Sequence, residues 1–215
     1  MDKERSRAKQ KRHKRLMGLI DADPLMSDSR LAHELGVSVG TVRLDREVLE
    51  LPGLRERTRL MAERAGSRLV SMRQEEVMGE ILELEPNRRA LSVFSTNREY
   101  AFRHTNLIAD HYIYAQAATL AIAVVREALA VVRAARVQFS RAAFVGEKLA
   151  ASARVGTHKD DKYVVSVHTR AGEREVFIAR FIVAAIGNIS GDAAQNDRGE
   201  EGFSDAFRAG RDGGG

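Results

Sequence analysis

The chain has 215 residues, 44% of them hydrophobic, which suits one large domain or two small ones with an ordinary packed core. It contains no cysteine, which excludes disulfides, thiolate chemistry and cysteine-ligated metal centres and favours a reducing, cytoplasmic compartment. The sequence has no apolar run long enough for a signal peptide or a membrane span, so no membrane partner is expected.

Residues 1–15 form a predicted basic N-terminal arm. They hold eight lysines and arginines against two acidic residues, while the whole chain carries a net charge of only +5. A basic arm before a folded domain favours a polyanionic partner such as nucleic acid, although a merely solvated run of charge is the alternative. Lys11 and Arg12, close to the first predicted helix, are the candidate DNA-contacting residues of the arm.

Residues 16–52 are predicted to form three short helices, because apolar residues recur there at helical spacing in three blocks. Ser27 is a suitable N-cap for the second helix, Gly36 a suitable end for it, and Ser38 a suitable N-cap for the third. Only a short turn then separates the last two helices, which is typical of a helix-turn-helix DNA-binding domain.

In the third helix the pattern predicts that Val39, Val42 and Val48 are buried, which leaves Gly40, Thr41, Arg43 and Arg46 facing outwards. Arginine can bind the major-groove edge of guanine with two hydrogen bonds, and threonine suits a phosphate or a thymine methyl. The alternative is that the arginines pair with neighbouring acidic residues on a solvated surface. The candidate DNA-contacting residues on this helix are Ser38, Gly40, Thr41, Arg43 and Arg46.

Residues 53–70 are predicted to form an amphipathic linker helix after the break at Pro52 and Gly53. The alternative is one more helix of the small domain. The apolar stripe of this helix consists of Leu54, Met61, Ala62 and Ala65.

Residues 71–186 change to short, partly alternating apolar runs separated by turn residues. The pattern predicts two strands, one long helix over 104–125 with almost no polar face, and four more strands. A helix that is apolar all round has to be covered on all sides, as a sheet curled around it would do. The glycine-rich segment 187–215 has few large apolar residues and is predicted to be a disordered tail.

The common catalytic and cofactor motifs are missing from the sequence. The six histidines form no ligand set, and there is no glycine-rich phosphate loop and no nucleophilic serine or cysteine motif. We therefore expect that the protein binds no metal, needs no cofactor and is not an enzyme.

Three stretches carry a resemblance to a known family. These are "VSVGTVRLDR", the amphipathic linker, and "EEVMGEILELEPN" followed by "FRHTNLIADHYIYAQAATLAIAV". In order and spacing they resemble the FapR family, repressors of fatty acid and phospholipid biosynthesis genes, over residues 10–185. The resemblance implies an α+β protein with a DeoR-like helix-turn-helix domain, a linker helix and a hot-dog domain similar to acyl-CoA thioesterases. It also implies a homodimer on double-stranded, palindromic DNA that malonyl-CoA or malonyl-acyl carrier protein releases.

At the expected effector site the sequence departs from the family. The arginine that pairs with the malonyl carboxylate in the family is Ala109 here, the glycine after it is Asp110, and an asparagine of the acyl site is Ala118, whereas Phe102 keeps a family pocket position. The response to malonyl-CoA is therefore expected to be weakened or lost, and the pocket to accept another acyl-CoA or none. The alternative function is a hot-dog thioesterase with an attached DNA-binding domain, in which Asp110 would have to supply the carboxylate unless it is only a helix N-cap.

Overall fold

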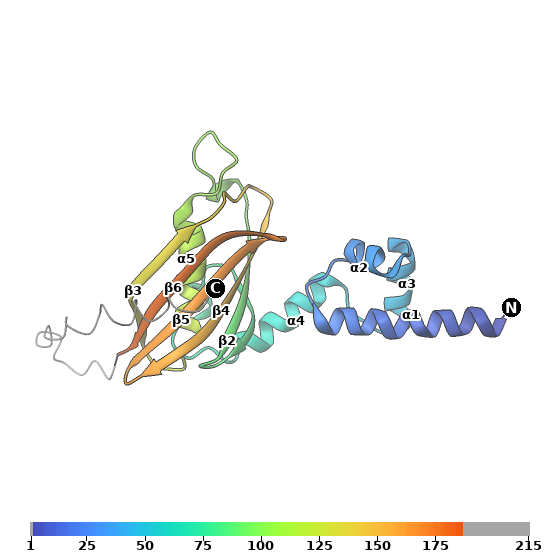
Figure 1. Ribbon diagram of the computed structural model, residues 1–215, viewed down its shortest axis with the longest axis horizontal. Helices are drawn as coiled ribbons and strands as arrows, with labels where there is room; N and C mark the ends of the chain where they lie inside the picture. Colours follow the sequence, from blue (N-terminus) through green and yellow to red (C-terminus); the bar gives the residue numbers. More distant parts are fainter. Residues whose placement is uncertain (1, 187–215) are drawn as a thin grey trace, which may run out of the picture.

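The computed structural model describes residues 2–186 and consists of a small helical domain, a linker helix and a larger sheet domain (Figure 1). No helix within these residues is both long and apolar enough to span a membrane. The predicted tail 187–215 lies outside the described residues. The helices of the small domain and the linker are α1 (Asp2–Ala22), α2 (Asp28–Leu35), α3 (Val39–Val48) and α4 (Leu54–Gly66).

Helix α1 corrects the predicted boundary between an arm and a first helix. It runs unbroken from Asp2 to Ala22, so the basic arm 1–15 and the first helix of the 16–52 domain are one element. The reason is local: until Gly18 this stretch contains no glycine and no proline, and it is rich in lysine and arginine, which are good helix formers. The basic residues are thus presented on a helix that projects past the small domain (Figure 1).

The small domain has its own core where α1, α2 and α3 meet. Leu16, Leu31 and Val42, one from each helix, are completely buried there, and Ile20 and Met26 pack beside them. The two caps lie where the sequence placed them. The Ser27 and Ser38 hydroxyls accept backbone hydrogen bonds at the starts of α2 and α3, and Gly36 ends α2 with φ +65°.

The sheet domain is one antiparallel sheet with the strand order β1-β2-β4-β5-β6-β3, and helix α5 (Asp110–Ala123) packs against one face of it. Two strands, a helix and four strands follow in the predicted order. Two short 3-10 helices lie at Gln74–Glu76 and Arg98–Tyr100. The strands are β1 (Glu80–Glu85), β2 (Arg89–Ser95), β3 (Ala130–Phe139), β4 (Lys148–Lys159), β5 (Lys162–Ala171) and β6 (Arg174–Ala185).

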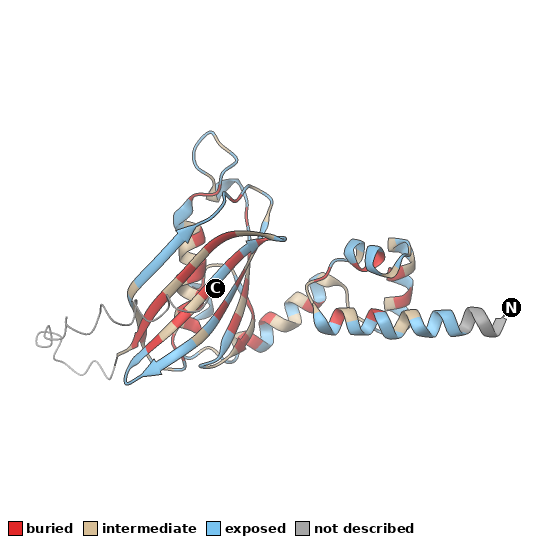
Figure 2. Ribbon diagram, viewed as in Figure 1, coloured by how far each residue is buried: buried red, intermediate tan, exposed pale blue. Residues whose placement is uncertain are grey.

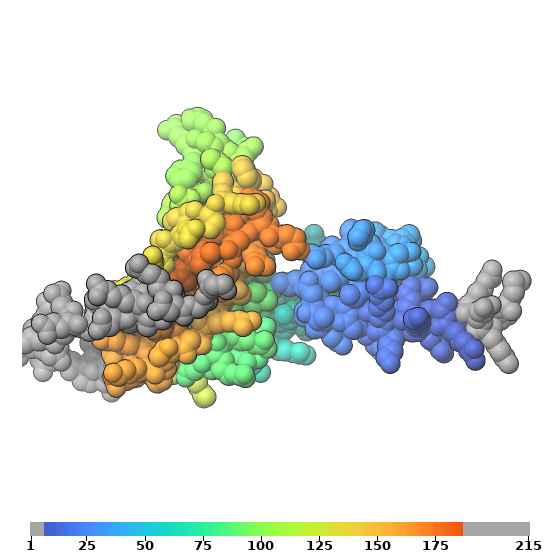
Figure 3. All heavy atoms as spheres, viewed as in Figure 1, coloured from blue at the N-terminus to red at the C-terminus, as the bar shows by residue number. Residues whose placement is uncertain are grey.

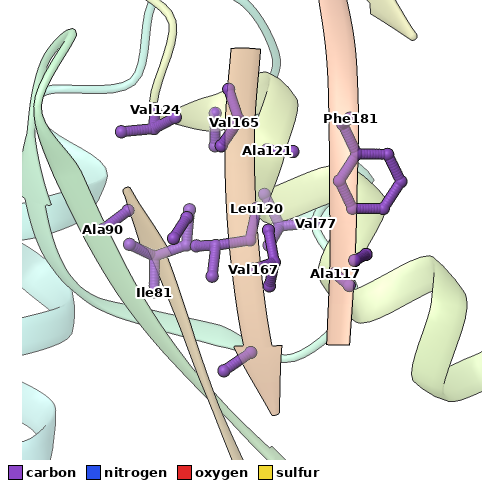
Figure 4. Packing of buried hydrophobic residues seen from close by; sticks show 14 of the residues in the cluster. Val77, Ile81, Ala90, Ala117, Leu120, Ala121, Val124, Val165, Val167 and Phe181 are labelled. Carbon is purple, nitrogen blue, oxygen red and sulfur yellow. The ribbon is translucent and has the colours of Figure 1, made fainter. Parts of the chain in front are cut away.

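Helix α5 is wrapped by the sheet, which is why it lacks a polar face. It contacts five of the six strands, and Ala117, Leu120 and Ala121 are fully buried against Val165 and Phe181 (Figures 2 and 4). The buried amide of Gln116 also belongs to the core: its side chain donates hydrogen bonds to Ser92 Oγ and to the Leu149 carbonyl. This is the arrangement of a hot-dog domain.

Helix α5 is shorter than the predicted 104–125 segment at its N-terminal end. Residues 101–109 form a loop in which Ala101 pairs with Ile108, Leu107 pairs with Phe144, and His104 has φ +63°. These pairings satisfy the backbone outside a helix, and apolar content alone does not distinguish such a loop from a helical turn. The loop projects from the sheet domain (Figures 1 and 3).

Candidate DNA-binding surface and effector site

Helix α3 places a small set of side chains on its solvent face. Ser38 Oγ accepts a hydrogen bond from the Thr41 backbone amide at 3.1 Å and lies 2.9 Å from Thr41 Oγ1, so both residues form the exposed N-terminal cap of the helix. Gly40, one residue into the helix, is exposed and has no side chain that would keep a DNA backbone at a distance. The predicted trio of Ser38, Gly40 and Thr41 therefore lies together at the start of α3.

Arg43 has the exposure that a DNA-reading residue needs. Its side chain is 70% exposed, and its Nε lies 3.6 Å from Asp28 Oδ2, too far for a good hydrogen bond. Leu44 beside it is 65% exposed, an unusual state for leucine. The sequence analysis missed Leu44, although its position four residues after Gly40 places it on the same helix face. An exposed leucine here is suited to a thymine methyl.

The structure overturns the outward orientation that was predicted for Arg46. Its side chain is only 14% exposed, Nη2 donates to Asp28 Oδ2 at 2.8 Å, and Nη1 donates to the Leu51 carbonyl at 3.3 Å. The cause is helix geometry, because Arg46 lies four residues after the buried Val42 and so on the same face. Arg46 binds the first turn of α2 and does not point to solvent.

The same geometry corrects the predicted buried positions of α3. Val48, six residues after Val42, lies on another side of the helix and is 62% exposed, and Val39 is only half-buried. The position that is buried instead is Asp45, three residues after Val42. A buried carboxylate in a small core needs a partner.

That partner is Arg12, which was predicted to contact DNA. Arg12 donates from Nε to Asp45 Oδ2 at 2.5 Å and from Nη2 to Oδ1 at 3.0 Å, and this hydrogen bonding holds the pKa of Asp45 below its usual range. Nε and Nη2 of Arg12 are therefore engaged by Asp45 within the domain, and its predicted contact with DNA would have to come from Nη1. Lys11 remains exposed and lines a groove of about 310 Å³ with Arg15, Leu35 and Val37 between α1 and the turn of the helix pair.

Helix α4 connects the two domains and is bound at both ends. At its start Arg57 is buried and donates hydrogen bonds to the carbonyls of Pro24, Met26 and Pro52. Burial lowers the pKa of Arg57, and the nearby charge of Arg46 lowers it further. Near its end Ala65 joins the core of the hot-dog domain, where α4 packs along β1. No composition or spacing signal identified Arg57 as an anchor.

The predicted effector residues lie around the N-terminal end of α5. Ala109 is the N-cap, has no side chain that could cap the helix, and is 3% exposed. Asp110 is the first residue of the helix and is exposed, so the expectation that Asp110 is itself the N-cap is wrong by one residue. Phe102 is 47% exposed in the projecting loop, and Ala118 is half-buried two turns into the helix.

Apolar side chains close to this end lie open to solvent. Val137 and Phe139, on the face of β3 that looks towards α5, are 39% and 44% exposed, and Phe144 is 43% exposed. The strand β3 is also an edge of the sheet. An edge strand with an uncovered apolar face is an unusual surface for a monomer.

A helix-turn-helix domain with a basic first helix, linked to a hot-dog domain, defines a DNA-binding regulator with a small-molecule sensor domain. No protein-family profile matches the chain. It is 36% identical over 177 residues to the transcription factor FapR of Halalkalibacterium halodurans, covering 82% of this chain and 95% of that protein. It is 37% identical over 178 residues to the FapR of Bacillus velezensis, covering 81% and 95%. The chain belongs to the FapR family of transcription factors.

Solved structures agree on the fold of the larger domain. A sigma28-regulated virulence protein from Campylobacter jejuni superposes with a TM-score of 0.55 at 22% identity, covering 59% of this chain and 91% of that one. An uncharacterised protein from Pyrococcus horikoshii gives 0.50 at 21% identity, covering 60% and 92%. At such identities the likeness shows the hot-dog fold and nothing about ligand or reaction.

Proposed function

We propose that this repressor binds a palindromic double-stranded operator of fatty acid and phospholipid biosynthesis genes as a homodimer in the cytoplasm. The observation that carries the proposal is the solvent face of α3, where exposed Arg43 and Leu44 follow a capped helix start at Ser38 and Thr41. Lys11 and the basic end of α1 would add contacts to phosphates, which raise affinity without reading sequence.

The homodimer is supported by the edge strand β3. Pairing of this edge with a second copy would satisfy its backbone groups and cover Val137 and Phe139. A symmetric pair of helix-turn-helix domains would then read two half-sites in a palindrome.

For the effector we propose a weakened or lost response to malonyl-CoA. A malonyl group brings a carboxylate that is costly to desolvate without a partner, and an arginine fork is its natural partner. Ala109 and Ala118 offer no donor, and the exposed Asp110 adds a negative charge to the first turn of α5. Losing a charge-assisted contact of this kind costs about 2 to 5 kcal/mol. Another acyl-CoA without this carboxylate would be less affected.

We also propose that the hot-dog domain regulates and does not hydrolyse thioesters. Ala118 has no carboxylate that could activate water. Among the four predicted effector residues only Asp110 is acidic, and it is exposed in the first turn of α5. Incubation with malonyl-CoA and acetyl-CoA should therefore release no free thiol, and steady release that Asp110→Asn abolishes would contradict this.

The test of the effector proposal is a titration of the operator-bound protein with malonyl-CoA, acetyl-CoA and free CoA at one salt concentration, with calorimetry in parallel. The unaltered protein should bind malonyl-CoA only weakly, with a Kd above about 10 μM. The triple variant Ala109→Arg, Asp110→Gly, Ala118→Asn should bind it at least thirtyfold more tightly and release DNA. Micromolar or tighter binding by the unaltered protein would overturn the proposal and point to another cation near Phe102 in the sequence, such as Arg98 or Arg103.

A further inference from the structure

Asp45 is the buried carboxylate of the recognition helix, and its side chain interacts with two residues of α1. Its side chain is 5% exposed, both its oxygens accept hydrogen bonds from Arg12, and His13 Nε2 lies 2.9 Å from Oδ1. Arg12 and His13 are themselves only 25% and 14% exposed. We call this group of three residues the Asp45 clamp. It joins the third helix to the first at a point that the apolar core does not reach.

The clamp lies where α1 leaves the small domain. The core contacts of α1 come from Leu16, Leu19 and Ile20, all on the C-terminal side of Arg12. On the other side, residues 2–11 contain no large apolar side chain, and at 1.5 Å per residue they extend about 15 Å further. The clamp is therefore the last charged anchor before the projecting basic end of the helix.

That projecting end carries cations on several sides. Lys9 lies three residues before Arg12 on the clamp side of α1, and Lys11 and Arg7 are exposed beside it. A helical segment of this length is marginal in water unless the end that joins the domain is held in place. When that end is fixed, the lysines and arginines lose less conformational entropy on binding a phosphate backbone, so they bind it more tightly.

We propose that Asp45 is a positioning residue for DNA binding. Through Arg12 and His13 it fixes the direction of the basic end of α1 relative to the recognition helix, so that both reach the same DNA half-site. The proposal deepens the proposed function and rests on it. It separates two arginines that look alike in the sequence: Arg12 acts on Asp45, and Arg43 acts on DNA.

The test is a double-mutant cycle between the clamp and the cations that it positions. Asp45→Asn is combined with a background in which Lys9 and Lys11 are changed to glutamine, and operator affinity is measured over a range of salt concentrations. In the native background Asp45→Asn should weaken binding about tenfold and lower the log–log salt slope by about 1 to 2, the value for one or two lost phosphate contacts. In the glutamine background it should change affinity less than twofold.

Two further variants separate positioning from folding. Ile20→Val removes packing from α1 but keeps the clamp, so it should lower the unfolding temperature and leave the salt slope unchanged. Arg12→Lys keeps the charge but cannot donate from both ends of a fork, so it repeats the test from the α1 side if Asp45→Asn does not fold. Asp45→Glu should restore part of the slope.

Equal losses in the two backgrounds would overturn the proposal and make Asp45 an ordinary structural residue. A steeper salt slope in Asp45→Asn would also overturn it, since Asp45 would then only keep Arg12 away from DNA. Failure of the unaltered chain to prefer any operator over random duplex would instead refute the proposed function.

Discussion

Arg43 and Arg46 lie three residues apart in one helix, and truncation to alanine should affect different properties. Arg43→Ala should lower DNA affinity, whereas Arg46→Ala should lower the stability of the small domain. Arg43 is 70% exposed, and the Asp28 carboxylate lies 3.6 Å from its Nε, so leaving that pair to bind DNA costs little. Loss of a two-bond contact with guanine costs about 1 to 3 kcal/mol, or roughly 5- to 150-fold in operator affinity. We expect Arg43→Ala to lose this affinity and to keep its unfolding temperature.

Arg46→Ala should instead destabilise the small domain. It removes the 2.8 Å hydrogen bond to Asp28 and the weaker one to the Leu51 carbonyl, and it leaves a mostly buried carboxylate without its main partner. A hydrogen bond to a charged group contributes about 1.5 to 3 kcal/mol, so we expect the free energy of unfolding to fall by about 2 to 3 kcal/mol. The preference for operator over random DNA should persist in the folded fraction.

The assay is a pair of titrations, with the operator and with a scrambled duplex of equal length, together with thermal unfolding of each variant. Glu47→Ala, on the exposed side of the same helix, is the matched control. If Arg43→Ala weakens both duplexes equally, Arg43 is a phosphate contact and the reasoning is wrong. If Arg46→Ala loses specificity at an unchanged unfolding temperature, the assignment of Arg46 to the interior is wrong.

Three other outcomes follow from the helices around α3. Deleting residues 1–10 should flatten the salt dependence of DNA binding, because four lysines and arginines are lost, and an unchanged slope would mean that this end of α1 does not touch DNA. Met61→Glu in α4 should change DNA affinity while both domains still unfold cooperatively, and loss of cooperative unfolding would make Met61 ordinary core. Hydrogen bonding from Arg12 lowers the pKa of Asp45, so the free energy of unfolding should fall as the pH drops through that lowered value. In Asp45→Asn this loss of stability at acid pH should be smaller. An identical dependence of stability on pH in the two proteins would contradict the clamp.

The sequence predicted the features that depend on neighbouring residues. Ser27, Gly36 and Ser38 end or start helices because a cap is a contact over two or three residues, and such contacts can be read from the chain. The order of strands and helix followed in the same way from local alternation. The family resemblance added the hot-dog closure of the sheet, which local patterns alone do not determine.

The misplaced residues depend on partners far away in the chain. Arg46 is turned inward by Asp28, eighteen residues earlier, and Arg12 by Asp45, thirty-three residues later. The start of α5 was misplaced because Leu107 pairs with Phe144, thirty-seven positions further along. An arginine looks the same in the sequence whether it faces DNA or a buried carboxylate, although counting four residues from Val42 would have placed Arg46 correctly.

The contacts of α4 indicate where the two domains can move relative to each other. Among the described residues one ion pair joins the two domains, between Arg30 and Glu173, which are 54% and 80% exposed, and a pair so exposed adds little. Arg57, by contrast, makes three hydrogen bonds of 2.7 to 2.9 Å from a buried charge, at about 1.5 kcal/mol or more each. On the hot-dog side, Ala65 of α4 and the half-buried Leu69 just after it pack on the core, and Arg68 Nη1 donates a hydrogen bond to the Leu84 carbonyl at 3.1 Å. The burial of Ala65 and Leu69 contributes about 2 to 3 kcal/mol.

Separation should therefore occur first between α4 and β1, with α4 moving as part of the DNA-binding domain. A ligand can drive this motion only by as much as its affinity differs between the docked and undocked states. To offset a docking contact of about 2 to 3 kcal/mol, the affinities of the ligand for the undocked and docked states have to differ by roughly 30- to 150-fold. A single charge-assisted contact at the start of α5 could supply that difference. At the proposed effector site Ala109 offers no such contact, so an effector would have to obtain its preference from the rest of the acyl group or from CoA.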